Sequence, residues 1–467
     1  MFQETEIKLR IDPETANSIR THPILAARQA EGWRSGVIYN QYYDTPDKRL
    51  ASAGVALRMR RDGDQYIQTL KYNADSIAGM STRKEWDWYL DSPDLDLSVL
   101  DSHCWPADLK DVDTRQLAPI FRTDFKRTRA LIRWQRNMEI VEVEAAIDEG
   151  SIETAESSDS ICELELELRK GPDIAVLELA HSLAESTALM PCDLSKSERG
   201  YKLLVQAEPN YERAFLQWAD TVKVRTAMRD IGQALLADLV SLSEHFYTSH
   251  DWTSFCRLHR KLGILHQYFQ VFRGNIPKLV REELIEYADA FFNDHQMDAF
   301  VSLNEINRDD YAESVFNSWI RSHRWGRLLI GFGKWLHTEL SGSDQSIGAT
   351  GKTSDYVLIS WLKNEIVRTM DILQKPHINL PGEEKLMRYG VISRPIPLRL
   401  SFILGCFWSF LDVERPSSLL RELEELAFCM DRFPLDSGRE RVVYESSLKE
   451  LQRWDEIITS KIHEHVF

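Results

Sequence analysis

Residues 2–11 combine the alternation of a β-strand with an unusual distribution of charge. Successive side chains of a strand point to opposite faces, so in FQETEIKLRI the residues Glu4, Glu6 and Lys8 share one face and the aliphatic residues share the other. The segment ICELELELR at 161–169 repeats the pattern with three glutamates on one face. Carboxylates at this spacing repel one another, so an enclosed face would need cations beside them. The charged face of these strands must therefore either be exposed to solvent or line a water-filled interior.

The chain changes its periodicity near residue 205. Before that point, apolar and polar residues alternate in segments separated by turn sequences, which predicts β-strands. The predicted strands are 2–11, 37–44, 54–61, 65–72, 83–90, 126–135, 138–148 and 161–169. Helical stretches are predicted at 13–30, 94–102, 113–118 and 173–188. Many antiparallel strands with short turns favour a barrel or a strongly curved sheet.

From about residue 212, apolar residues recur at helical spacing, which predicts an all-α region. A length of 467 residues also exceeds that of one ordinary domain. We therefore predict an α+β chain with a β-rich domain at 1–205, a polar linker at 206–211 and a separate helical bundle at 212–467.

Composition excludes several classes of partner. The net charge of −16 argues against a general nucleic-acid binder, which should carry a basic surface. No uninterrupted apolar run approaches the length of a membrane span, so we expect no membrane partner. The six cysteines are scattered without a CxxC pair, which predicts ordinary thiols and a cytoplasmic location. Any polyanion site must then be a local cluster of cations.

Charged residues also share faces on the other predicted strands. The cations are Arg58, Arg60, Lys71, Arg83, Arg127 and Arg129, and the carboxylates include Glu85, Asp87, Glu142, Glu144 and Asp148. Burying so many charges without water is costly, so inward-facing charges favour a wet channel filled by a ligand. Carboxylates without thiolates or imidazoles suit Mg²⁺ or Mn²⁺, and arginine and lysine suit phosphoryl oxygens. Spacing alone leaves this interpretation and an outward-facing charged sheet equally open.

The order of these segments resembles the CYTH domain of the triphosphate tunnel metalloenzymes. The resemblance rests on ETEIK at 4–8, YYDTPD at 42–47, GVALRMR at 54–60, TDFKR at 123–127, CELELEL at 162–168 and LSKSERGY at 194–201. It implies an eight-stranded antiparallel β-barrel that forms a tunnel. A helical domain after a CYTH domain resembles the CHAD domain of bacterial CYTH–CHAD inorganic triphosphatases. The implied activity is hydrolysis of inorganic triphosphate to pyrophosphate and phosphate.

The resemblance also assigns roles to residues. Two divalent cations, Mg²⁺ or Mn²⁺, would be held by Glu4, Glu6, Glu163, Glu165 and Glu167. Triphosphate oxygens would be bound by Lys8, Arg58, Arg60, Lys71, Arg83, Arg127 and Lys196. Glu85, Glu144 and Asp148 would occupy further charged tunnel positions. One metal would screen phosphate charge while the other orients and acidifies the attacking water. The alternative for Arg83–Glu85 and Arg127–Glu144 is a set of ion pairs that only balance the tunnel.

The resemblance of the helical domain to CHAD implies that it binds polyphosphate. Its predicted basic clusters are Arg257, His259, Arg260, Lys261, His266 and Arg273; Arg321, His323, Arg324 and Arg327; and Arg388, Arg394 and Arg399. The alternative for each cluster is a solvated helix face. Two other functions stay open for the chain: an adenylyl cyclase or a nucleoside or thiamine triphosphatase of the same fold, and a non-catalytic polyphosphate-binding scaffold.

Overall fold

The computed structural model describes residues 2–72, 76–100, 104–205, 216–219, 221–294, 307–340, 356–374, 395–429 and 437–464. The chain divides into two compact units. The first contains Met1–Asn210 and Ile320–Lys334, and the second contains Tyr211–Trp319 and Trp335–Phe467. The predicted linker at 206–211 lies outside the described residues, so the predicted domain limits stay a prediction.

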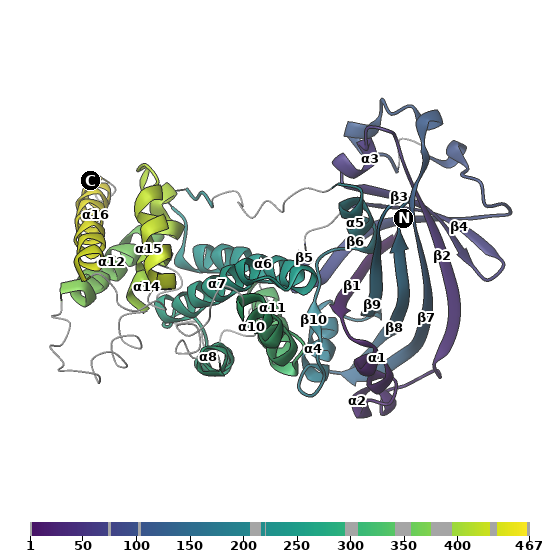
Figure 1. Ribbon diagram of the computed structural model, residues 1–467, viewed down its shortest axis with the longest axis horizontal. Helices are drawn as coiled ribbons and strands as arrows, with labels where there is room; N and C mark the ends of the chain where they lie inside the picture. Colours follow the sequence, from purple (N-terminus) through teal and green to yellow (C-terminus); the bar gives the residue numbers. More distant parts are fainter. Residues whose placement is uncertain are drawn as a thin grey trace. The chain divides into compact units, whose positions relative to one another are not determined.

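The first unit is built around a closed antiparallel β-barrel (Figure 1). Its eight strands are β1 (Phe2–Arg10), β2 (Arg34–Asp44), β3 (Val55–Asp62), β4 (Gln65–Tyr72), β6 (Met80–Leu90), β7 (Ala118–Arg136), β8 (Glu139–Glu153) and β9 (Ser158–Lys170). They follow the order β1-β9-β8-β7-β2-β3-β4-β6, and pairing of β1 with β6 closes the barrel. Two short strands, β5 (Ser76–Ile77) and β10 (Met190–Pro191), pair with β6 and β1. The predicted α+β fold with an eight-stranded barrel is confirmed.

The barrel wall has its hydrophobic core on the outside. Ile7 and Leu9 of β1 are fully buried and pack in one cluster with Leu179 of α4 (Ile174–Leu183). The alternate residues of the same strand, such as Glu6 and Lys8, line the barrel interior. The period-two pattern therefore places the aliphatic face under a helix and the charged face inside the barrel.

Three predicted helical stretches differ from the structure. Residues 13–30 form two short helices, α1 (Pro13–Ile19) and α2 (Pro23–Ala26), because Pro23 begins a new helix rather than continuing the first. The described residues of the stretches at 94–102 and 113–118 contain only the 3₁₀ turns η1 (Leu97–Val99) and η3 (Thr114–Gln116), and η2 (Ala107–Leu109) lies between them. Strand β7 begins at Ala118 instead of 126, because the segment pairs with both β2 and β8.

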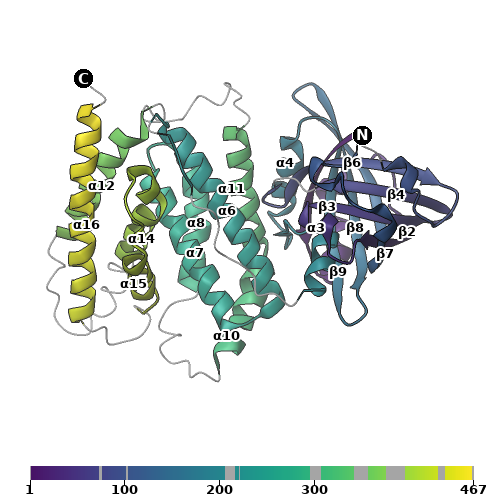
Figure 2. The same cartoon turned by 90° about the horizontal axis from the view of Figure 1, so that it is seen from above.

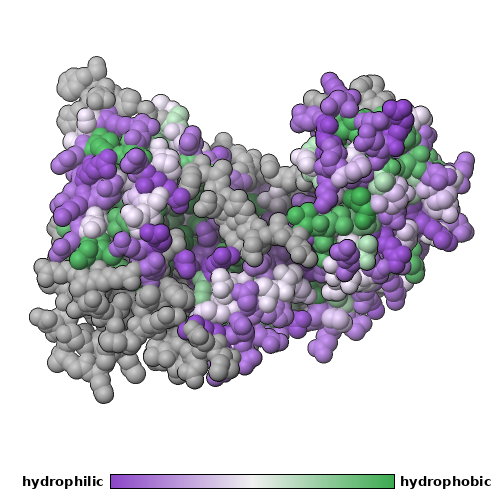
Figure 3. Space-filling view, turned by 45° about the horizontal axis from the view of Figure 1, so that its top comes forward, coloured by the Kyte–Doolittle hydropathy of each residue, from purple (hydrophilic) through white to green (hydrophobic). Residues whose placement is uncertain are grey.

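The second half of the chain is helical, as predicted (Figure 2). Its helices are α6 (Val224–Ser249), α7 (Trp252–Val271), α8 (Lys278–Asp294), α10 (Arg308–Val315), α11 (His323–Leu340), α12 (Leu358–Gln374), α14 (Pro395–Phe407), α15 (Ser417–Cys429) and α16 (Ser437–Glu464). Fully buried aromatic residues such as Phe246, Phe269 and Trp454 form its interior. Hydrophilic side chains cover most of the coloured surface in Figure 3. Among the described helices, none combines the length and the apolar character that crossing a bilayer requires.

Candidate active site

The barrel encloses a cavity of about 160 Å³ whose walls are mostly charged. Of the residues predicted for the site, all except Asp148 and Glu163 line this cavity. Those two are more deeply buried, with exposed fractions of 0% and 2%. The charged strand faces therefore point inward and not to solvent. Tyr42, Arg129 and Arg169 also line the cavity, as do Ala56, Asp87, Ser195 and Ser197.

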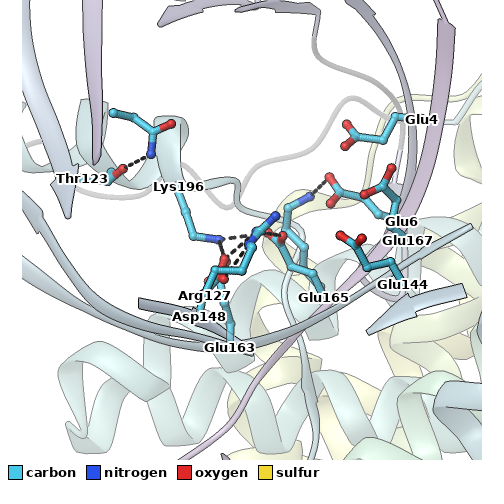
Figure 4. A network of polar contacts seen from close by, with 12 residues as sticks. Glu4, Glu6, Thr123, Arg127, Glu144, Asp148, Glu163, Glu165, Glu167 and Lys196 are labelled. Atoms are coloured by element: carbon cyan, nitrogen blue, oxygen red, sulfur yellow. Dashed lines mark hydrogen bonds and ion pairs between the residues drawn. The ribbon is translucent and has the colours of Figure 1, made fainter. Parts of the chain in front are cut away.

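Four glutamates form what we call the unbalanced carboxylate cluster: Glu4, Glu6, Glu144 and Glu167. Strand register places Glu167 of β9 directly opposite Glu6 of β1 on one side and Glu144 of β8 on the other. The four carboxylates lie on the same part of the wall in Figure 4. Burial and the charges of the other three glutamates raise the pKa of Glu167 to about 8, although Arg169 counteracts them. Lys71 pairs with Glu4, Lys8 contacts Glu6, and Arg169 contacts both Glu144 and Glu167. The four carboxylates therefore share three cations, one of which, Lys71, also pairs with Glu85.

Three further acids form the balanced carboxylate cluster: Asp148, Glu163 and Glu165, whose oxygens lie within 4.8 Å of one another. Lys196 Nζ lies 2.7 Å from Asp148 Oδ2 and 2.9 Å from Glu165 Oε1, and it also contacts Glu163. Arg127 donates to both carboxylate oxygens of Asp148 at 2.8 and 2.7 Å and contacts Glu165 (Figure 4). Burial opposes ionisation of Glu165, but Lys196 and Arg127 outweigh it and hold its pKa well below the usual range. These acids already have cationic partners.

Lys196 is positioned by the short helix α5 (Lys196–Leu203). Ser195 and Glu198 form a capping box that fixes the start of the helix. Gly200 lies so close to the ring of Phe121 that a Cβ there would collide with it. One turn after Lys196, Arg199 Nη1 lies 3.2 Å from Glu163 Oε2 and adds a third cation to the balanced carboxylate cluster. The local sequence thus fixes both the depth and the direction of the lysine.

Two cations on β3 and β4 share a carboxylate on β6. Lys71 Nζ lies 3.1 Å from Glu85 Oε2 and 2.7 Å from Glu4 Oε2. Arg58 Nη2 lies 3.5 Å from Glu85 Oε1. The glutamate at position 85 therefore serves as a counterion for two cations, of which Lys71 also pairs with Glu4, whereas Arg58 depends on the shared carboxylate and is incompletely neutralised.

Three other arginines lining the cavity form no ion pair with a carboxylate among the described residues: Arg60, Arg83 and Arg129. Burial and the like charges of Arg58 and Arg127 lower the pKa of Arg60 to about 10. The Nε atoms of Arg58 and Arg83 are buried without a hydrogen-bond partner. Among the described residues, the ion pairs Arg83–Glu85 and Arg127–Glu144 considered from the sequence are not formed. This side of the cavity can therefore accept an anion.

The carboxylate oxygens of the unbalanced carboxylate cluster are of the kind that a hard divalent cation such as Mg²⁺ or Mn²⁺ prefers. Among the described residues, however, the three acids whose oxygens converge within 4.8 Å are those of the balanced carboxylate cluster. Three predicted metal ligands, Glu4, Glu6 and Glu167, belong to the unbalanced carboxylate cluster. The other two predicted ligands, Glu163 and Glu165, lie in the balanced carboxylate cluster, where Lys196 supplies positive charge. The structure therefore brings the five predicted ligands together as two groups.

Sequence reasoning gave no site role to Arg169, Arg199 or Asn40. Arg169 continues the glutamate face of 163–167 by one more alternate position, so the period-two pattern contains a signal for it. Asn40 shares a strand face with Tyr42 in the same way, although its polar partner on β7 lies 83 positions away and gives no local signal. Arg199 lies three residues after Lys196, and side chains at this spacing are neighbours on the surface of a helix, so helical periodicity contains a signal for Arg199.

Part of the chain is similar in sequence to a curated protein. The inorganic triphosphatase of Haemophilus influenzae is 30% identical over 203 residues, which are 44% of this chain and 55% of that protein. The chain thus spans about half the length of this curated relative.

Solved structures give more distant matches. The Mimivirus capping enzyme triphosphatase is 15% identical, with a TM-score of 0.22, over 38% of this chain and 86% of that one. A protein from Pyrococcus horikoshii is 15% identical, with a TM-score of 0.25, over 39% of this chain and 86% of that one. The CYTH domain family matches residues 3–201. The part of the chain that is similar to the CYTH domain is thus the part that folds into the charged barrel.

Proposed function

We propose that this chain hydrolyses inorganic triphosphate to pyrophosphate and phosphate in the barrel cavity. The observation that carries the proposal is the polarity of the cavity, with excess carboxylates on one part of its wall and incompletely neutralised arginines on another. A triphosphate is a compact polyanion whose oxygens match guanidinium groups and divalent cations. The similarity to an inorganic triphosphatase supports this substrate class.

In this proposal, arginines and lysines hold the phosphoryl oxygens. Arg60 and Arg83 have donors available, and Arg58 is only partly neutralised by Glu85, which it shares with Lys71. A water oxygen forms a new bond to phosphorus while an anhydride P–O bond breaks, and the leaving phosphate retains the bridging oxygen. Fixing the substrate in a cavity of about 160 Å³ favours this reaction through proximity and excludes most bulk water.

The unbalanced carboxylate cluster is the proposed place for Mg²⁺ or Mn²⁺. When bound, such an ion screens phosphate charge and lowers the pKa of water. Glu4, Glu6 and Glu167 would hold it, with Glu144 beside them. A second ion at Glu163 and Glu165 would have to compete with the ammonium group of Lys196.

A substrate panel tests the proposed function. Phosphate release is measured from tripolyphosphate, ATP and thiamine triphosphate, with added Mg²⁺ or Mn²⁺ and with EDTA. We expect release from tripolyphosphate to exceed the others and to stop in EDTA. The variants Glu4→Gln and Glu6→Gln should lose it, whereas Glu156→Gln, on the exposed surface, should not. Formation of cyclic AMP, or activity unchanged in Glu4→Gln and Glu6→Gln, would contradict the proposal.

For the helical unit we propose binding of polyphosphate. Glu365, which is 3% exposed, contacts Arg368 and lies 3.2 Å from Arg399, and Arg273 is close enough to act on its pKa. Three arginines around one carboxylate leave excess positive charge. The predicted cluster residues Arg388 and Arg394 lie outside the described residues. Titration of long-chain polyphosphate into the full chain and into Arg273→Ala/Arg399→Ala tests this proposal, which equal affinities would refute.

We also propose a cytoplasmic location. The cysteines whose side chains are described, Cys104, Cys162, Cys192, Cys256 and Cys406, carry free thiols. Burial raises the pKa of Cys162 to about 11 and that of Cys406 to about 12. Free, unreactive thiols are typical of proteins in a reducing compartment.

A further inference from the structure

A buried asparagine next to the cavity contacts one of its arginines. Asn40 lies in the middle of β2, is 1% exposed and does not line the cavity itself. Arg60 Nε donates to Asn40 Oδ1 at 2.9 Å, and Asn40 Nδ2 donates to Thr123 Oγ1 at 2.8 Å, the bond drawn at Thr123 in Figure 4. Strand register places Asn40 directly opposite Arg60 on β3 and Thr123 on β7. One side chain therefore links three neighbouring strands.

The chemistry of the three groups fixes the direction of this chain of hydrogen bonds. A guanidinium group only donates, so the amide must present its oxygen to Arg60. The amide nitrogen then requires an acceptor, and the hydroxyl oxygen of Thr123 supplies it. Thr123 is fully buried, so water does not replace it as the acceptor. The amide of Asn40 thus has one orientation in which both of its ends are satisfied.

The charge of the group that holds Arg60 is as important as the position of that group. Lys8, Lys71, Arg127 and Lys196 each lie within 3.1 Å of a carboxylate oxygen. Among the described residues, Arg60 forms no such ion pair, and its partner is a neutral amide. A neutral acceptor holds Nε without cancelling the charge. The two terminal nitrogens and the full positive charge of Arg60 remain available on the cavity wall.

We propose that Asn40, anchored by Thr123, is a positioning residue that orients Arg60 toward a phosphoryl group while leaving its charge unneutralised. This inference rests on the proposed function, in which Arg60 binds the triphosphate. A carboxylate at position 40 would hold the guanidinium equally well, but it would compete with the phosphate for it. The neutrality of the side chain is therefore part of its function.

Three substitutions at two positions test the proposal. Tripolyphosphate affinity is measured by calorimetry in EDTA, and KM and kcat are measured with Mg²⁺. We expect Asn40→Ala to weaken binding and to raise KM about tenfold, as for loss of a hydrogen bond to a charged group, with a smaller change in kcat. Thr123→Val should have the same effect because it removes the acceptor, and Thr123→Ser should restore wild-type values because it keeps the acceptor.

The variant Asn40→Asp distinguishes two possible roles of Asn40: orienting Arg60 for phosphate, and only stabilising the strand. The new carboxylate would pair with Arg60 and relieve its repulsion from Arg58 and Arg127, so we expect a higher melting temperature than for Asn40→Ala. Its tripolyphosphate affinity should nevertheless be as low as that of Asn40→Ala or lower. If Asn40 only supported the strand, affinity would recover together with stability, and that result would overturn the proposal.

Two controls complete the experiment. Gln41 is the next residue of β2, so its amide lies on the opposite face of the strand from Asn40, where it donates to the backbone oxygen of Phe121. Gln41→Ala should therefore leave tripolyphosphate affinity unchanged. Arg60→Ala tests the proposed function itself. If Arg60→Ala weakens binding while Asn40→Ala and Asn40→Asp do not, the positioning role is wrong and the phosphate site stands. If Arg60→Ala binds as wild type, the role of Arg60 in the proposed function is also wrong.

Discussion

Glu167 lies opposite two other glutamates of the barrel wall, Glu6 and Glu144, and shares its cationic partner Arg169 with Glu144. Its pKa of about 8, raised by burial and by neighbouring glutamates, means that the folded protein holds this proton more tightly than the unfolded chain, where the pKa is near 4.5. The resulting stability is fully present below pH 4.5 and is lost as pH rises through about 8. The metal-free barrel therefore becomes less stable as Glu167 ionises.

We predict that replacing Glu167 by glutamine removes this pH dependence. In EDTA, the unfolding free energy of the wild type relative to Glu167→Gln should fall by roughly 2–4 kcal/mol between pH 4.5 and 8.5. Urea titrations followed by circular dichroism at both pH values measure it. In Mg²⁺ the cation replaces the proton, so the wild type should bind Mg²⁺ more tightly as pH rises through 8. An equal stability difference at both pH values would contradict the prediction.

Lys196 is the main counterion of the balanced carboxylate cluster. Removing it leaves buried acids without their ammonium partner, so Lys196→Met should lose roughly 3–5 kcal/mol of stability. The same three acids, with oxygens within 4.8 Å of one another, would then keep only Arg127 and Arg199 as cationic partners and have room for a divalent cation in place of the ammonium group. We predict that Mn²⁺ restores part of the lost melting temperature in Lys196→Met and gives a smaller increase in the wild type.

The control for this prediction is Lys126→Met on the exposed face of β7. It should change the melting temperature little, with or without Mn²⁺. If Mn²⁺ raised the melting temperature of Lys196→Met no more than that of the wild type, the three acids would not form a cation site when freed.

Which residues face the cavity follows from the sequence, but which carboxylate meets which cation does not. Period-two alternation within a strand is local, and it correctly places Glu6 and Lys8 on one face. The pairing of Arg127 with Asp148, by contrast, depends on the register between β7 and β8, which tertiary packing determines. For that reason Asp148 was predicted as a tunnel residue but not as the partner of Arg127 and Lys196.

At the level of elements, α5 acts as a rigid support for the site. Tyr201 donates to Asp44 Oδ2 at 2.7 Å, and this fully buried carboxylate also accepts from the backbone of Leu50 and Ala51 in α3 (Arg49–Ser52). Burial and the nearby Asp44 raise the pKa of Tyr201, so it stays a donor. The helix that carries Lys196 is thus fixed to the loop after β2.

Gly200 tests the importance of that support. Gly200→Ala places a methyl group against the ring of Phe121, so α5 must shift, at a cost of roughly 1–3 kcal/mol. We predict a lower melting temperature together with a lower kcat for tripolyphosphate, because Lys196 moves with the helix. Gly32→Ala, with open space around it, is the matched control. The double variant Gly200→Ala/Phe121→Leu should recover part of both quantities, and failure to recover either would argue against the proposed clash.

Elements with a strong local pattern were predicted well, and those decided by distant contacts were not. The strand predicted at 54–61 differs from β3 by one residue at each end, because the alternation of polar and apolar residues in this segment is complete. The first part of β7 was missed because Pro119 and several polar residues hide the alternation, while pairing with β2 and β8 stabilises the strand. The predicted helix at 94–102 shortens to a single 3₁₀ turn, where Asp96 accepts from the backbone of Ser98.

At the scale of the whole molecule, the candidate site and the family match are confined to the first unit. Every predicted site residue comes from the barrel strands or from α5, within residues 3–201. Arg273 and Arg399 belong to the second unit and lie outside this site. Substitutions of these two arginines should change polyphosphate binding without changing the hydrolysis of tripolyphosphate.

We therefore predict that Arg273→Ala/Arg399→Ala, made in the full chain, keeps kcat/KM for tripolyphosphate within about twofold of wild type, because the groups it removes belong to the second unit. Arg58→Ala in the barrel should lower kcat/KM by tenfold or more, since it removes a charged donor to phosphate. Circular dichroism must first show that the double variant retains its helices, because Arg399 lies 3.2 Å from the buried Glu365. If a folded double variant lost hydrolysis to the same extent as Arg58→Ala, the helical unit would contribute directly to turnover. A selective loss of long-chain polyphosphate binding would instead assign the two units to two separable anion sites.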